Sequence, residues 1–255
     1  MRHFILSILI SFFTQAYFAH DSLKVYIASS HIGDNVKNYV KKFGPEVELI
    51  DFSLVEKTKI HELLRNCRGL LLLGGKDINP ALYKKEKLKS YCSTDLKRDS
   101  LELILLKWAD SSQVPIMGIC RGMQFINAYF GGTLCVDIPN FCKPTKVKEL
   151  HRDPKRQKDV YHKITIEPNS ILSTCFQGVS NLNVNSFHHQ CVDELAPPLK
   201  VVARSEGGII EAIENDPEKR KTFILAVQWH PERMFENIAA QQVIFERFVN
   251  AVVNQ

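Results

Sequence analysis

The fold is decided by one stretch of the chain, VPIMGICRGMQFINAYF at residues 114–130. Its first six residues are apolar and predict a buried strand over 114–119, and the spacing that follows predicts a helix over 122–130. Cys120 lies between two glycines at this turn. A nucleophile on a tight strand-to-helix turn needs such small neighbours. Cys120 is therefore predicted as a catalytic nucleophile, and the alternative is a structural buried thiol, which is the usual role of a cysteine.

Apolar strands and helical patterns alternate on both sides of this stretch. Before it, strands are predicted at 23–29, 47–52 and 69–73, and helices at 36–43, 60–67 and 96–111. The second half is richer in strands, which are predicted at 163–166, 183–186, 200–204, 209–214 and 224–228, before a last helix at 239–253. This rhythm predicts a doubly wound, flavodoxin-like α/β fold, in which helices cover both faces of a mostly parallel sheet. A single domain is expected over 20–255.

The composition is that of an ordinary globular protein, with 45% apolar and 24% charged residues among 255. The net charge of +5 comes partly from basic runs at 84–89 and 143–158. These runs have no interleaved aromatic residues and match no nucleic-acid motif, so we expect solvated surface and no nucleic-acid partner.

The first residues differ from the rest, because a short basic start is followed by an apolar run over 4–13 and by small residues at Thr14 and Ala16. This pattern predicts a secretory signal peptide over 1–19, and the run is too short for a stable membrane anchor. The alternative is a buried N-terminal strand or helix. The protein is expected to be exported, periplasmic or secreted, if the segment is cleaved, and otherwise cytoplasmic.

The six other cysteines have no CxxC or zinc-like spacing. In an oxidising compartment they could form up to three disulfides, but we expect most of them to be small buried thiols.

Two further motifs complete a candidate site. His230 and Glu232 follow a predicted strand, and residues two apart on an extended chain point the same way. His230 is the candidate general base and acid, and Glu232 would orient its ring; the alternative is a solvated turn. Gly74 and Gly75 end another strand, where a backbone N–H could serve as an oxyanion donor beside that of Arg121. A plain turn is an equal alternative for this glycine pair. The helix that starts after Cys120 should favour the thiolate.

These motifs together resemble the class I glutamine amidotransferase-like hydrolases, and in particular the gamma-glutamyl-gamma-aminobutyrate hydrolase branch of the C26 peptidase family. The matching segments span residues 69–233 in family order, and they include GGKDINPALY at 74–83, RDSLE at 98–102, PIMGICRGMQ at 115–124, GGTL at 131–134, VNSFHHQ at 184–190 and VQWHPE at 227–232. One departure is EGGIIEA at 206–212, where the family commonly has an acidic residue followed by one glycine. This departure leaves the fine substrate preference open.

The resemblance implies a triad of Cys120, His230 and Glu232 and an oxyanion hole from Gly75 and Arg121. It also implies a substrate surface, whose predicted residues are Gly74, Gln124, Ser186, Phe187 and His188. The expected reaction is hydrolysis of a γ-glutamyl amide through a γ-glutamyl thioester, without metal or cofactor. Neither His188 nor His189 is expected to bind a metal.

The expected partner is a small γ-glutamyl molecule, and a homodimer is compatible with the sequence. Two alternatives remain. The first is a glutaminase subunit that donates ammonia to a synthetase, which would share the catalytic residues. The second is a non-catalytic binding protein on the same fold.

Overall fold

A computed structural model describes residues 24–40, 47–142, 149–234 and 238–255 of the chain. The predicted signal peptide at 1–19 lies outside these residues, as does the end of the helix predicted over 36–43. Within the described part, no helix has the length and apolar character needed to cross a bilayer.

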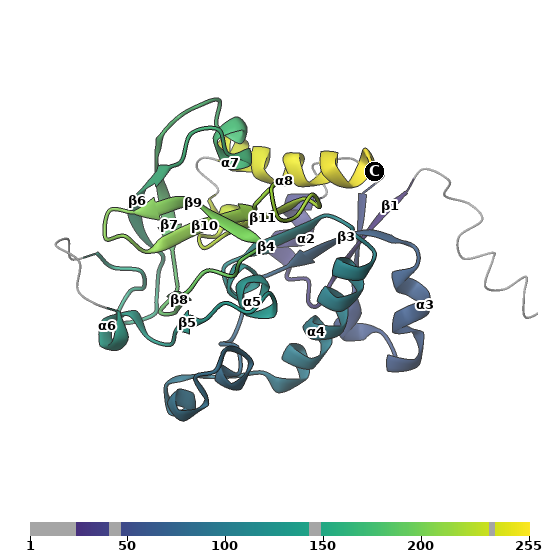
Figure 1. Cartoon of the computed structure of the whole chain (residues 1–255), viewed down its shortest axis with the longest axis horizontal. Helices are drawn as coiled ribbons and strands as arrows, with labels where there is room; N and C mark the ends of the chain where they lie inside the picture. Colours follow the sequence, from purple (N-terminus) through teal and green to yellow (C-terminus); the bar gives the residue numbers. More distant parts are fainter. Residues whose placement is uncertain (1–23, 41–46, 143–148, 235–237) are drawn as a thin grey trace, which may run out of the picture.

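A nine-stranded sheet forms the centre of the molecule, in the order β2-β1-β3-β4-β11-β10-β9-β6-β7 (Figure 1). Its first five strands in this order are parallel to one another. They are β2 (Val47–Asp51), β1 (Val25–Ser29), β3 (Cys67–Leu72), β4 (Ile116–Ile119) and β11 (Ile224–Val227). Every residue of β4 and β11 is buried, because helices cover both faces at this point.

The other four strands extend the sheet in antiparallel fashion. They are β10 (Ile210–Asn215), β9 (Leu199–Ser205), β6 (Val160–Ile166) and β7 (Asn181–Ser186). Along β6 the side chains alternate between exposed and buried, as expected where one face of a sheet contacts water. A separate two-stranded sheet pairs β5 (Leu134–Cys135) with β8 (Cys191–Val192).

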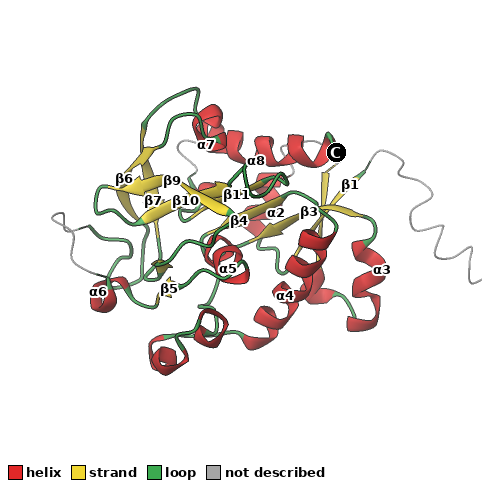
Figure 2. Cartoon of the chain, in the orientation of Figure 1, coloured by secondary structure: helices red, strands yellow, loops and turns green. Residues whose placement is uncertain are grey.

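Helices form a layer on each face of the large sheet (Figure 2). One layer consists of α2 (Asp34–Val40), α7 (Ile171–Cys175) and α8 (Ile238–Val253), and the core on this side includes Phe245 and Phe248. The other layer consists of α3 (Ile60–Leu64), α4 (Leu96–Ser111) and α5 (Arg121–Tyr129). A short helix, α6 (Ile138–Phe141), lies beyond β5. The doubly wound α/β prediction is confirmed, and the antiparallel strands are an extension of it.

Local sequence explains the two helices that matter most for the site. Helix α4 begins after Asp95, whose side chain accepts a hydrogen bond from the backbone N–H of Arg98 at 3.1 Å and so caps the helix. Helix α5 follows β4 with only Cys120 between them. The carboxyl ends of β3, β4 and β11 are adjacent, and they bring the three predicted motifs to one edge of the sheet.

Candidate active site

Cys120 occupies a strained backbone position between β4 and α5. Its φ of 52° and ψ of −107° lie where a residue with a side chain is rare. Hydrogen bonds hold it there: its N–H donates to the carbonyl of Val227 at 2.8 Å, and its carbonyl accepts from the N–H of Gln124 at 3.3 Å. This is the geometry of a nucleophile elbow, in which the side chain is presented at the sheet edge and at a helix N-terminus.

The two glycines that flank Cys120 are required by close packing. A Cβ on Gly122 would lie 2.2 Å from the carbonyl oxygen of Leu72, so the start of α5 passes directly against β3. A Cβ on Gly118 would lie 2.8 Å from the backbone of Gly122. The glycines on either side of Cys120 are therefore needed because helix, strand and turn pack too closely there for a side chain.

His230 and Glu232 form a hydrogen-bonded pair beside this elbow. Nδ1 of His230 lies 2.7 Å from Oε1 of Glu232, and both side chains are buried. A carboxylate at Nδ1 fixes the imidazole so that Nε2 is available for proton transfer. The ring also lies against the glycine loop, because a Cβ on Gly74 would be 2.8 Å from Cε1 of His230 and 3.7 Å from Cβ of Cys120.

The sequence predicted that the chain stays extended through this motif, and this prediction is wrong. Residues Pro231–Arg233 form a 3-10 turn directly after His230. Proline suits the first position of such a turn, since its fixed φ is helical and its missing N–H is not needed there. The turn folds Glu232 back toward His230, so the pair forms by a different local geometry from the one expected.

The charge state of His230 is set by its neighbours. Burial by itself lowers the pKa of His230, but the negative charges of Cys120 and Glu232, together with hydrogen bonding, raise it to about 10. The imidazole is thus a cation at neutral pH, and a protonated imidazole at this position has the chemistry of a general acid.

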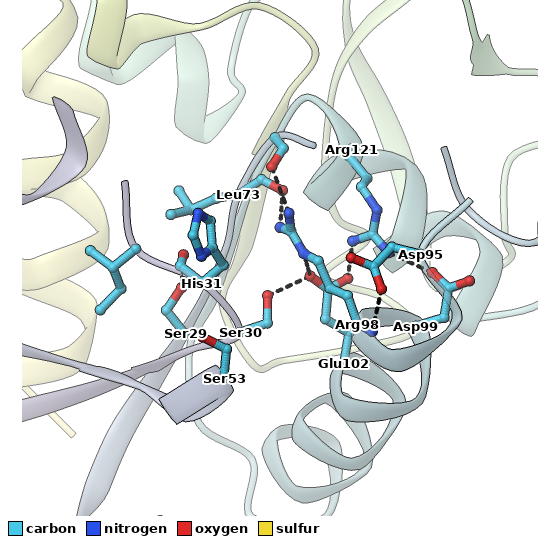
Figure 3. Close-up of polar contacts among 12 residues, drawn as sticks. Ser29, Ser30, His31, Ser53, Leu73, Asp95, Arg98, Asp99, Glu102 and Arg121 are labelled. Atoms are coloured by element: carbon cyan, nitrogen blue, oxygen red, sulfur yellow. Dashed lines mark hydrogen bonds and ion pairs between the residues drawn. The ribbon is translucent and has the colours of Figure 1, made fainter. Parts of the chain in front are cut away.

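Arg98 fixes the orientation of the Gly74–Gly75 peptide (Figure 3). Its Nη1 donates to the carbonyl oxygen of Gly74 at 2.9 Å, and its Nη2 donates to that of Leu73 at 2.7 Å. Because the peptide bond is trans, the N–H of Gly75 points away from Arg98. Within the described part of the chain, neither the backbone N–H of Gly75 nor that of Arg121 donates a hydrogen bond. Both are free to act as oxyanion donors.

The side chain of Arg121 is anchored away from the site. It donates to Asp99 at 2.5 Å and to Glu102, and it is almost fully buried. Glu102 also accepts from Arg98 Nε at 2.8 Å and from the hydroxyl of Ser30 at 2.5 Å. Figure 3 shows Ser30, Arg98 and Arg121 around Glu102. One carboxylate on α4 thereby connects the two arginines that position the two predicted oxyanion donors.

Comparison with known proteins agrees with this geometry. The model of the peptidase C26 family matches residues 15–232. The chain belongs to the peptidase C26 family. It is 38% identical over 200 residues to a glutamine amidotransferase-like protein of Lactococcus lactis, YvdE, covering 78% of this chain and 80% of the relative. It is 32% identical over 206 residues to the gamma-glutamyl-gamma-aminobutyrate hydrolase PuuD of Escherichia coli, covering 78% and 77%.

A solved structure extends the likeness to the fold. The glutaminase domain of the Trypanosoma brucei CTPS, with bound acivicin, has a TM-score of 0.60 and 17% identity, and the match covers 91% of this chain and 95% of that one. The class I glutamine amidotransferase fold of this C26 chain is confirmed.

The predicted substrate residues of this C26 chain have varied surroundings. Gln124 is buried, and its amide donates to the carbonyl of Gln190 at 3.0 Å and to Gln228 at 3.1 Å. The Ser186 hydroxyl donates to the carbonyl of His151 at 2.7 Å. Phe187 is half-buried under the guanidinium of Arg233, whose carbon lies 5.4 Å from the ring centroid.

His188 and its neighbour point to different groups. His188 is buried and lies near Glu211, with 3.6 Å between Nε2 and the carboxylate oxygen Oε1. The next ring, His189, bridges Asp77 and Asp137 at 2.9 Å each. Substrate binding by Gly74, Gln124, Ser186, Phe187 and His188 stays a prediction.

Two positioning residues of the C26 site were not singled out in the sequence. Arg98 is one. The other is Asn185, whose Oδ1 accepts from the N–H of His230 at 2.9 Å and whose Nδ2 donates to its carbonyl at 3.0 Å. Both occur inside the motifs that carry the family resemblance. Their presence in those motifs was the available signal, but nothing in the residue types indicated which backbone groups they would bind.

All seven cysteines of the C26 chain are free thiols. Three of them, Cys135, Cys142 and Cys191, cluster near a cavity of about 550 Å³. The Sγ atoms of Cys142 and Cys191 are 3.4 Å apart. None of these thiols belongs to the Cys120 site.

Proposed function

We propose that the protein hydrolyses the amide bond of γ-glutamyl amides, including γ-glutamyl amines and γ-glutamyl peptides. The observation that carries the proposal is the pairing of a thiol on a strained elbow with a hydrogen-bonded His230–Glu232 pair. A binding protein on the same fold would gain nothing from that arrangement. The relative PuuD is a gamma-glutamyl-gamma-aminobutyrate hydrolase, and this supports the choice of the γ-glutamyl amide as substrate class.

In the first step the Cys120 thiolate attacks the γ-carbonyl carbon. The oxyanion that forms is held by the N–H groups of Gly75 and Arg121. His230 gives its proton to the leaving amine, the carbon–nitrogen bond breaks, and a γ-glutamyl thioester remains on Cys120.

In the second step a water molecule gives a proton to His230 and attacks the thioester carbonyl. The tetrahedral intermediate collapses, glutamate leaves, and the Cys120 thiolate is restored. Glu232 stabilises the imidazolium through both steps. Protons and bonds balance over the cycle, which consumes one amide and one water.

The test is glutamate release from a panel of γ-glutamyl-γ-aminobutyrate, other γ-glutamyl amines, γ-glutamyl peptides and glutamine. We expect turnover of at least one γ-glutamyl amine or peptide. Cys120→Ala should reduce kcat/KM by at least about four orders of magnitude, because the thioester can no longer form. Acid quenching during turnover should trap a γ-glutamyl group on the Cys120 peptide, visible by mass spectrometry.

Cys175→Ala is the matched control, because that thiol is half-buried outside the Cys120 site, and its partial burial raises its pKa to about 11. Activity in this variant should equal that of the wild type. Turnover of glutamine alone would instead support a glutaminase subunit. Failure to hydrolyse any member of the panel would support the non-catalytic alternative and overturn the proposal.

A further inference from the structure

A second polar cluster lies in the antiparallel part of the sheet. Glu211 on β10 is fully buried and is approached by three imidazoles. His162 is on β6, His151 precedes β6, and His188 follows β7. Distances from Glu211 Oε1 are 3.4 Å to Nδ1 of His151, 3.2 Å to Nε2 of His162 and 3.6 Å to Nε2 of His188.

These close approaches are not hydrogen bonds. The buried atoms without a hydrogen-bond partner include both carboxylate oxygens of Glu211, Nδ1 of His151, Nε2 of His188 and both ring nitrogens of His162. Leaving one such polar atom unpaired in a dry interior costs about 1–3 kcal/mol. Several unpaired polar atoms close together in the interior indicate that a ligand binds between these side chains.

The tautomer of His188 sharpens this conclusion. Its Nδ1 lies 2.9 Å from the carbonyl oxygen of Gln190, and a carbonyl can only accept, so Nδ1 carries the proton. In the neutral ring Nε2 then presents a lone pair toward a carboxylate oxygen of Glu211. Two lone pairs that face each other repel unless a proton or a metal ion lies between them, so this nitrogen is placed to act as a metal ligand.

The dimensions and charges suit a metal ion. Ligands at 2.0–2.1 Å around tetrahedral zinc are separated from one another by about 3.3–3.4 Å. The ligand atoms of His151, His188 and Glu211 all lie within 4.8 Å of one another. Glu149 lies 3.3 Å from Nε2 of His151, as the outer carboxylate of a carboxylate–histidine–metal arrangement does. Two carboxylates balance the charge of one divalent ion.

We propose, contrary to the expectation from the sequence that His188 binds no metal, that His151, His188 and Glu211 bind a divalent transition-metal ion of the zinc type. All three ligands are buried, which suits a structural site rather than a catalytic one. The ion would connect β10 to the segment before β6 and to the segment after β7. The segment after β7 includes Gln190, whose carbonyl holds Gln124.

The test is the metal content of the full-length protein after EDTA treatment, dialysis and addition of Zn²⁺ alone, measured by mass spectrometry of the dissolved metal. We expect one equivalent of zinc that persists in Cys120→Ala and in Cys142→Ser, which remove the competing thiol sites. Glu211→Gln and His188→Ala should each weaken zinc binding by at least about a hundredfold. His61→Ala, at an exposed position on α3, should bind like the wild type.

Two measurements keep the result interpretable if a cluster variant fails to fold. Zn²⁺ should raise the Tm of the EDTA-treated wild type. Co²⁺ should give the visible bands of a tetrahedral nitrogen and oxygen site without a thiolate charge-transfer band. A wild type that takes up no zinc and whose Tm does not change would overturn the proposal. Binding that needs Cys120 or Cys142, or equal binding by Glu211→Gln, would also overturn it. These readouts do not depend on hydrolysis, so they stand apart from the proposed function.

Discussion

The parallel and antiparallel parts of the sheet place their polar residues in different ways. In the parallel part, β3, β4 and β11 are almost wholly apolar, and the candidate functional groups lie one to three residues after the strand ends, at Gly75, Cys120 and His230. In the antiparallel part, His162 and Glu211 lie within strands and point into the protein. Reactive groups at strand ends can meet a substrate, whereas ionisable groups inside strands must find their partners within the protein.

A substitution of Arg98 should have the largest effect on the strand-end site of the parallel part, although Arg98 does not contact the reacting atoms. Arg98→Lys keeps the charge but loses the planar fork that holds two carbonyls and Glu102. We expect kcat to fall by about a hundredfold with little change in KM, since an oxyanion donor is worth about that much and acts in the transition state. Steady-state kinetics on the best γ-glutamyl amide measures this.

The control for Arg98→Lys is Arg68→Lys, an exposed arginine that donates to the backbone of Gln255. It should leave both kinetic constants unchanged. A rise in KM alone for Arg98→Lys would mean that Arg98 serves substrate binding and does not orient the Gly75 peptide.

Asn185 joins the two parts of the sheet, because it is on β7 and binds both backbone groups of His230. Asn185→Ala leaves these groups unsatisfied in the interior, so we expect a loss of about 1–3 kcal/mol in the free energy of unfolding. Urea titration measures it, and Asn183→Ala, at an exposed position on the same strand, is the control. Equal effects in both variants would show that the link to His230 contributes little.

His230 should also make the stability of the protein depend on pH. Its folded pKa of about 10 lies above the ordinary 6.5, so its contribution to stability is complete below about pH 6.5 and is lost as pH rises through about 10. In Cys120→Ser the thiolate is absent, and the pKa of His230 should fall. Titration of its ring signal by NMR in both proteins tests this. An unchanged pKa in Cys120→Ser would assign the shift to Glu232 alone.

Much of the parallel part follows from local sequence. Helix α4 was predicted at the bounds that the structure has, and the strands differ from their predictions by one to three residues at an end. Continuous apolar runs and glycines at turns depend on local packing, so strands and turns of this kind can be predicted from the local sequence. The 3-10 turn at Pro231 could not be read this way, because extended and turned backbones both accept proline there.

The sequence by itself predicted the doubly wound fold and the strand-to-helix turn at Cys120, and it named His230 and Glu232 as candidate partners of that thiol. Each of these depends on a short motif with a local physical reason. Only the tertiary structure decided that Arg98 holds the glycine loop, that Asn185 holds the backbone of His230, and that three histidines gather around Glu211. These groups are brought together by strand order and register across dozens of residues. Local sequence does not indicate that these residues contact one another, because each is a polar residue of a type that is usually found at the protein surface.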